Sequence, residues 1–130
     1  MASEHQDFEP YVAAWRERWA REARERTRAI DERRVAALSL LPRLASVLQR
    51  DFGASRIWVV GSLARGDFSL GSDIDLAVEG LPLGRLFEAE GAIEALCGQG
   101  FRVDLVPLEL ARPRFRDALA VEGRLIQGGA

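Results

Sequence analysis

Two aspartates at alternate positions, preceded by a glycine–serine pair, are the residues of this chain best suited to chemistry. Asp73 and Asp75 flank one isoleucine, and ten residues separate them from Gly61-Ser62. In an extended strand, residues two apart point to the same face, so both carboxylates should project together while Ile74 packs on the other side. Adjacent carboxylates repel each other unless a cation lies between them. Hard oxygen ligands of this kind suit Mg²⁺ or Mn²⁺.

The residue types that are scarce narrow the chemistry further. All 18 basic residues are arginine, which excludes a lysyl–nucleotide intermediate, a Schiff base and a phosphate-loop lysine. The one histidine, His5, lies in a segment expected to be disordered, so a Ser-His-Asp triad is disfavoured. The single cysteine, Cys97, excludes an internal disulfide framework or a multi-cysteine zinc site and is expected to be a small buried hydrophobe. Acid–base and metal chemistry must therefore rest on carboxylates.

Length and charge set the class of protein. At 130 residues the chain is expected to form one domain with a single core. A net charge of −2 and a pI near 5.5 argue against general nucleic-acid binding. Neither a leader-like basic and apolar N-terminus nor a membrane-spanning apolar run occurs, so we expect a cytoplasmic protein without membrane association.

The residue pattern of the first third of the chain predicts helix. A long helix rich in Ala, Arg and Glu is expected from Phe8 to about Leu40, and Pro42 should break or kink it before a second helical piece that ends near Gly53. An apolar stripe at helical spacing comprises Phe8, Val12, Trp15, Trp19 and Ala23. We expect this stripe to pack on the domain's own core, with a protein interface as the alternative.

The remaining two thirds alternate between short strands and helices. Strands are expected at 57–60, 73–78, 102–106 and 125–126, and helices at 83–97 and 113–121. The chain is thus expected to comprise a helical extension, 1–53, and an α/β unit, 54–130.

Three kinds of site compete for residues 61–78. A Walker phosphate loop fails because Asp67 stands where lysine is needed, and an EF-hand loop starting at Asp73 fails because Val78 and Gly84 occupy its required glycine and glutamate positions. The third is a nucleotidyl-transfer site, in which a Gly-Ser turn holds a triphosphate and a paired-aspartate strand holds metal. Only this hypothesis fits.

The same stretch resembles a known family. Gly61-Ser62 followed by Asp73-Ile74-Asp75 resembles the signature of the DNA polymerase β-like nucleotidyltransferase superfamily, and the fuller stretch from Gly61 to Val78 resembles its minimal nucleotidyltransferase (MNT) branch. The similarity covers about residues 55–127, and Val103-Asp104-Leu105-Val106 matches the strand that carries the family's third carboxylate. The resemblance implies an α/β (α+β) fold with a small mixed sheet flanked by helices, here with an extra long N-terminal helix.

The resemblance also implies roles for individual residues. Asp73 and Asp75 would bind two divalent ions, Mg²⁺ or Mn²⁺, and Asp104 would ligate the catalytic ion and help to remove a proton from the acceptor hydroxyl. Gly61 and Ser62 would hold the β- and γ-phosphates of ATP. Arg65 would add positive charge there, although it could equally pair with Asp67 or with a helix end.

The expected reaction is transfer of AMP from ATP to a hydroxyl group. The chain is too short to build an acceptor pocket, so a second copy or a partner protein would present the acceptor. MNT-branch proteins resemble the antitoxins of HEPN/MNT toxin–antitoxin pairs, which adenylylate a tyrosine of the HEPN toxin.

An aminoglycoside-type nucleotidyltransferase is a second hypothesis, disfavoured because an added helical domain is missing. A non-catalytic antitoxin is the third, disfavoured by the three carboxylates.

Overall fold

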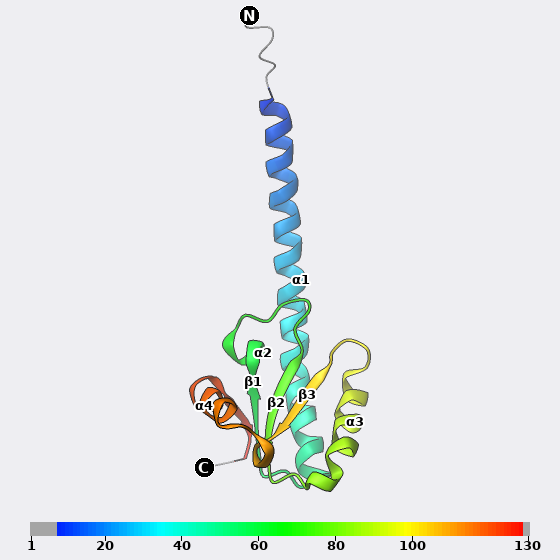
Figure 1. Cartoon of the computed structure of the whole chain (residues 1–130). Coiled ribbons are helices and arrows are strands. Elements are labelled where there is room, and N and C mark those ends of the chain that lie inside the picture. Colours follow the sequence, from blue (N-terminus) through cyan, green and yellow to red (C-terminus); the bar gives the residue numbers. More distant parts are fainter. Residues whose placement is uncertain (1–7, 129–130) are drawn as a thin grey trace, which may run out of the picture.

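A four-stranded mixed sheet forms the centre of the structure (Figure 1). The computed structural model describes residues 8–128, so the segment 1–7, expected to be disordered, lies outside it. The sheet order is β3-β2-β1-β4; β2 and β3 are parallel and the other neighbouring strands are antiparallel. The mixed sheet expected from the sequence is confirmed. The strands are β1 (Arg56–Val60), β2 (Ile74–Glu79), β3 (Val103–Pro107) and β4 (Arg124–Gln127).

Helices cover both faces of this sheet (Figure 1). The α-helices are α1 (Glu9–Arg50), α2 (Gly61–Arg65), α3 (Leu86–Cys97) and α4 (Pro113–Glu122), with short 3₁₀ turns at Leu83–Arg85 and Leu108–Leu110. The main core contains residues of α1 and α3, whereas α4 contributes Phe115 and Leu119 to a smaller apolar cluster. No helix within residues 8–128 is long and apolar enough to cross a membrane.

Side chains alternate along β2, so successive residues of this strand point to opposite faces of the sheet. Ile74, Leu76 and Val78 are fully buried in the main core, and Ala77 belongs to the smaller cluster beside α4. The expected burial of Ile74 is thus confirmed. Asp75 has the parity of Ala77, so it lies on the α4 face, where apolar cover is thin.

The long helix α1 runs unbroken through Pro42, so the predicted break there is wrong. Proline lacks the amide hydrogen that would bond to the carbonyl four residues earlier. In α1 this defect lies on the exposed face, where water can solvate the free carbonyl. On the opposite face Leu41, Leu44 and Ala45 are buried in the main core. Tertiary packing on that face therefore outweighs the local preference of proline.

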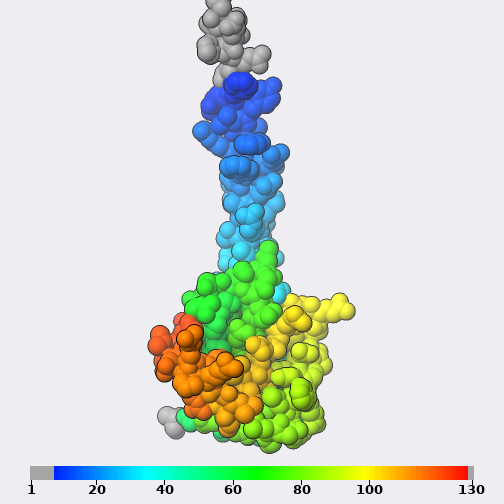
Figure 2. Space-filling view, in the orientation of Figure 1, coloured from blue at the N-terminus to red at the C-terminus, as the bar shows by residue number. Residues whose placement is uncertain are grey.

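The first half of α1 projects away from the sheet as an isolated rod (Figure 2). Trp15 and Trp19 stack with ring centroids 5.1 Å apart, yet they remain 55% and 58% exposed. The expectation that their stripe packs on the core is therefore wrong. The physical reason is distance along the helix, because buried positions in α1 begin only at Ala37.

The second half of α1 belongs to the same core as the sheet. Its buried residues are Ala37, Leu41, Leu44, Ala45 and Leu48. All of them lie in the segment 1–53, which the sequence predicts as an extension separate from the α/β unit, 54–130. That boundary remains a prediction. This part of α1 nonetheless packs in one hydrophobic core with the sheet and α3.

Two shortened chains test this arrangement. A chain of residues 29–130 should unfold cooperatively in urea, since it keeps every buried position of α1. A chain of residues 54–130 should not, because burial of each lost leucine contributes about 1.5–3 kcal/mol. Circular dichroism during urea titration measures both. Cooperative unfolding of residues 54–130 would contradict the shared core.

Candidate active site

The turn from β1 into α2 brings the backbone of Gly61 against the carboxylate of Asp75. Gly61 has φ +70°, in the left-handed region that favours glycine. A Cβ atom at this position would lie 2.3 Å from Oδ2 of Asp75. Both the backbone conformation and the space therefore require glycine. The Gly-Ser turn and the second aspartate of the motif are in direct contact.

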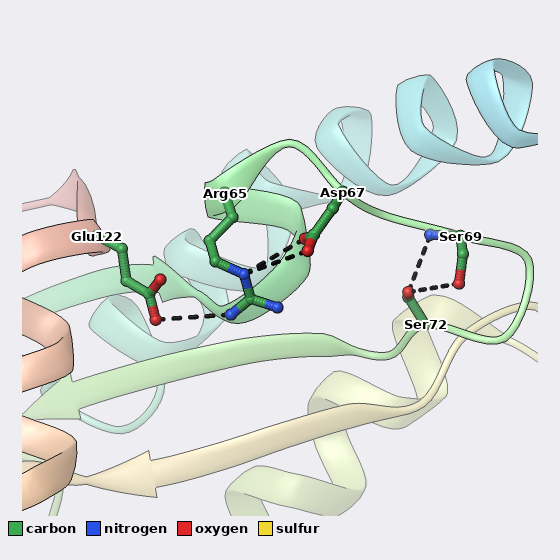
Figure 3. Close-up of polar contacts among 5 residues, drawn as sticks. All are labelled: Arg65, Asp67, Ser69, Ser72 and Glu122. Atoms are coloured by element: carbon green, nitrogen blue, oxygen red, sulfur yellow. Dashed lines mark hydrogen bonds and ion pairs between the residues drawn. The ribbon is translucent and has the colours of Figure 1, made fainter.

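The loop between α2 and β2 is held at several points. Helix α2 ends at Gly66, whose amide donates to the Ser62 carbonyl at 2.9 Å, and Phe68 is buried in the main core. The Ser69 amide donates to the Ser72 hydroxyl at 2.9 Å, and the two hydroxyl oxygens are 3.0 Å apart (Figure 3). This ordered loop leads directly into Asp73, which immediately precedes β2.

Two of the three predicted acidic residues lie on adjacent parallel strands, and the third, Asp73, immediately precedes one of them. Asp75 of β2 stands opposite Asp104 of β3 in the ladder. Both line a cavity of about 220 Å³, together with Gly61. Asp104 also lines a neighbouring hollow with Asp73. The fold thus places Asp104 beside both members of the Asp-x-Asp pair.

Asp75 is a half-buried carboxyl group with two other aspartates close to it. Burial, followed by the negative charges of Asp104 and Asp73, raises the pKa of Asp75 from 3.8 to about 6, and the positive charge of Arg65 partly opposes this increase. The carboxylate is therefore costly to hold ionised in the folded protein. A bound cation would remove that cost.

The metal ligands are not preassembled around one point. Within residues 8–128, no three acidic, histidine or cysteine side chains already form a metal-binding group. The donor chemistry nevertheless fits Mg²⁺ or Mn²⁺, because the carboxyl groups of Asp73 and Asp104 both lie close enough to Asp75 to raise its pKa, and carboxylate oxygens are the ligands that these ions prefer. The assignment of these aspartates as ligands stays a prediction.

Arg65 links three parts of the site. Its Nε lies 3.4 Å from both carboxylate oxygens of Asp67, and its guanidinium approaches Glu122 of α4 at 3.5 Å (Figure 3). Pairing with Asp67 was the alternative anticipated for this residue, and the structure shows it. The guanidinium nevertheless lies close enough to Asp75 to lower its pKa.

Sequence reasoning missed the wall of the cavity that α4 supplies. Phe115, Leu119 and Glu122 all line it. They follow one another at steps of four and three residues and so occupy one helix face. That periodicity was a usable signal for an amphipathic helix. Only the tertiary structure shows that this face turns toward the aspartates.

Comparison with known families identifies the fold. The model of the nucleotidyltransferase domain family matches residues 41–126. The chain belongs to this family. The match spans the Gly-Ser turn, all three aspartates and the first three residues of the last strand, and it also takes in the last ten residues of α1, which include four of its five buried positions. No curated protein sequence gives a significant match.

Solved structures place this nucleotidyltransferase domain beside MNT antitoxins. A chain in a mutant toxin–antitoxin MntA–HpeT structure gives a TM-score of 0.57 with 25% identity, covering 68% of this chain and 72% of that one. A toxin–antitoxin structure with AMP-PNP gives 0.58 and 25%, covering 67% and 73%. The tri-AMPylated Shewanella oneidensis HEPN toxin in complex with MNT antitoxin gives 0.57 and 20%, covering 72% and 73%. The expected family and fold are confirmed.

Substitution of Gly61 tests the contact between the turn and Asp75. Gly61→Ala should abolish nucleotide binding because its Cβ would displace the Asp75 carboxylate. Gly66→Ala is the matched control, since Gly66 also has a positive φ, +93°, but open space around it. It should lose only about 1 kcal/mol of unfolding free energy and retain binding. Calorimetric titration with ATP and Mg²⁺ compares the two, and equal losses would refute the steric argument.

The raised pKa of Asp75 predicts a pH-dependent stability. Below about pH 4 the carboxyl is protonated in both the folded and the unfolded states, so Asp75→Asn should behave as wild type. Between pH 4 and 6 the unfolded state releases its proton first, and wild type loses stability as pH rises. Above pH 6 the metal-free variant should be more stable by about 1–2 kcal/mol, allowing for solvent screening. Urea unfolding in chelator measures this difference, and saturating Mg²⁺ should reduce it. A constant difference from pH 3.5 to 7.5 would contradict the pKa shift.

Proposed function

We propose that this nucleotidyltransferase domain transfers AMP from ATP to a hydroxyl group, with Asp73, Asp75 and Asp104 holding two Mg²⁺ ions. The observation that carries the proposal is the contact of the Asp75 carboxylate with Gly61, at a position opposite Asp104. A turn able to hold phosphates and carboxylates able to hold divalent cations therefore border one cavity. Mn²⁺ could replace Mg²⁺, since both prefer oxygen ligands.

The protein residues divide the work of the transfer. The Ser62 hydroxyl and the amides of the turn bind the β- and γ-phosphates, which leaves the α-phosphorus near the aspartates. The acceptor oxygen bonds to the α-phosphorus, the bond from that phosphorus to the bridging oxygen breaks, and pyrophosphate leaves. Asp104 accepts the hydroxyl proton. The bound ions supply charge neutralisation and acidify the acceptor hydroxyl.

Arg65 contributes positive charge beside the phosphates. It lies at the end of α2, and its ion pairs with Asp67 and Glu122 fix the direction of its side chain. An incoming triphosphate would compete with Glu122 for the guanidinium, and charge-assisted bonds to phosphate are strong. Binding of ATP would therefore loosen the tie between Arg65 and α4.

The acceptor is a tyrosine of a HEPN-type toxin, encountered in the cytoplasm where ATP is available. Two neighbours at 25% identity come from toxin–antitoxin structures, and one of these contains AMP-PNP. The cavity of about 220 Å³ is also smaller than the roughly 300–1,000 Å³ typical of small-molecule sites. A second protein would present such an acceptor from outside this cavity.

Labelling of a HEPN partner tests this proposal. Wild-type protein with ATP labelled at the α-phosphate and Mg²⁺ should place AMP on a partner tyrosine. Asp104→Asn should slow labelling by at least about a hundredfold, the scale of a lost general base, and still bind the partner. Asp117→Asn, an exposed site on α4, is the matched control and should label normally. Mass spectrometry identifies the modified residue.

The other outcomes separate the competing functions. Label on an aminoglycoside but not on protein would favour a small-molecule enzyme. Neutralisation of the toxin without label on any acceptor, unaffected by Asp104→Asn, would favour a non-catalytic antitoxin. Either result would refute the proposed adenylylation.

A further inference from the structure

One arginine of α1 reaches the two loops that lead into the aspartate-bearing strands. Nη2 of Arg33 donates to the Ser72 carbonyl at 3.1 Å, and Nη1 donates to the Gly100 carbonyl at 2.8 Å. Ser72 directly precedes Asp73, and Gly100 lies three residues before the start of β3. A single guanidinium therefore ties together the N-terminal ends of β2 and β3. Residue 33 lies outside the region 41–126 that the family model matches.

The surroundings of this guanidinium are aromatic rather than acidic. Its carbon lies 4.4 Å from the ring centroid of Phe101 and 5.7 Å from that of Phe68. Its Nε is buried without a hydrogen-bond partner. Within residues 8–128 no carboxylate forms an ion pair with Arg33. A buried donor that lacks a partner costs free energy. Arginine serves at this position through the planar geometry of its guanidinium, whose two terminal nitrogens bond to the two carbonyls, rather than through an ion pair.

The two carbonyl bonds act where the β2–β3 ladder begins. The Ile74 amide donates to the Arg102 carbonyl at 2.9 Å, which closes the end of the ladder next to Arg33. Further along, the register sets Asp75 opposite Asp104. Like charges directly opposite each other on neighbouring strands are destabilising and tend to push these strand ends apart. The Arg33 guanidinium opposes that separation because its two hydrogen bonds fix both loops to α1.

We propose that Arg33 is a positioning residue that sets the distance between Asp73 and Asp104 for binding of divalent ions. The proposal rests on the metal role of the aspartates in the proposed function. It assigns to α1 a part in the site that is distinct from its part in the core. Loss of the guanidinium should weaken metal binding while leaving the Gly61–Ser62 turn in place, because the hydrogen bonds and aromatic contacts of Arg33 within residues 8–128 are made to other residues.

Direct Mn²⁺ binding by the full chain, followed by electron paramagnetic resonance, provides the test. Arg33→Met keeps an unbranched apolar stem but loses both hydrogen bonds, and its Kd for Mn²⁺ should rise about tenfold or more, the scale seen when groups that orient metal ligands are removed. Arg33→Lys can reach only one carbonyl at a time and should fall between Arg33→Met and wild type. Arg34→Met, which loses only an exposed ion pair with Asp31 at 3.8 Å, should change the Kd by less than twofold.

A second control separates positioning from general loss of stability. Leu44→Ala creates a cavity in the main core and should lower the melting temperature at least as much as Arg33→Met, yet leave the Kd for Mn²⁺ unchanged below the transition. Wild-type affinity in Arg33→Met, or equal weakening in Leu44→Ala, would overturn the proposal. Failure of the wild-type chain to bind Mn²⁺ would overturn it together with the proposed function. Mn²⁺ binding that depends on Arg33 in a protein that transfers no AMP would sustain it and refute only the proposed reaction.

Discussion

The carboxylate of Asp75, held against the Cα of Gly61 and close to two other aspartates, is the constraint around which this fold is arranged. In water such charges would separate. Here the parallel pairing of β2 with β3 brings Asp75 and Asp104 opposite each other. A shift of β2 by one residue would expose the buried Ile74 and Leu76, so burial of these side chains fixes the register. The apolar core on one face of the sheet therefore enforces repulsion on the other. A divalent cation, and a triphosphate bound with it, would offset the cost of burying the Asp75 charge and relieve this repulsion.

The helices divide the task of supporting this face. The second half of α1 fills the core behind the sheet, and α4 walls the cavity in front of it. Arg65 and Arg33 support this face in different ways. Arg65 lowers the pKa of Asp75 through its charge, whereas Arg33 holds the two loops through carbonyl bonds. The exposed first half of α1, with its stacked tryptophans, takes no part in this support.

The features that could be predicted from sequence are those fixed by local geometry. The turn at Gly61 follows from turn stereochemistry, and the burial of Ile74 beside the partly exposed Asp75 follows from the alternation of side chains in a strand. Both predictions were correct. Pro42 misled because helix propensity is local while the packing of Leu41 and Leu44 is not. The tryptophan stripe misled for a similar reason: periodicity shows that a helix has an apolar face but not whether anything covers it.

What lay beyond the sequence depends on contacts between distant residues. Arg33 meets Gly100 across 67 positions, and no spacing rule connects them. The position of α4 over the aspartates likewise required the strand order, which places β1 between β2 and β4. The Gly-Ser and Asp-x-Asp motif can thus be recognised from the sequence, but the residues that support its shape cannot.

A crystal structure of the chain with Mn²⁺ and AMP-PNP tests the central claim most directly, because anomalous scattering locates Mn²⁺ without reference to activity. The account predicts anomalous peaks within bonding distance of Asp75 and Asp104, with the triphosphate lying against the Gly61–Ser62 turn. Mn²⁺ bound elsewhere, or a triphosphate seated away from that turn, would contradict it.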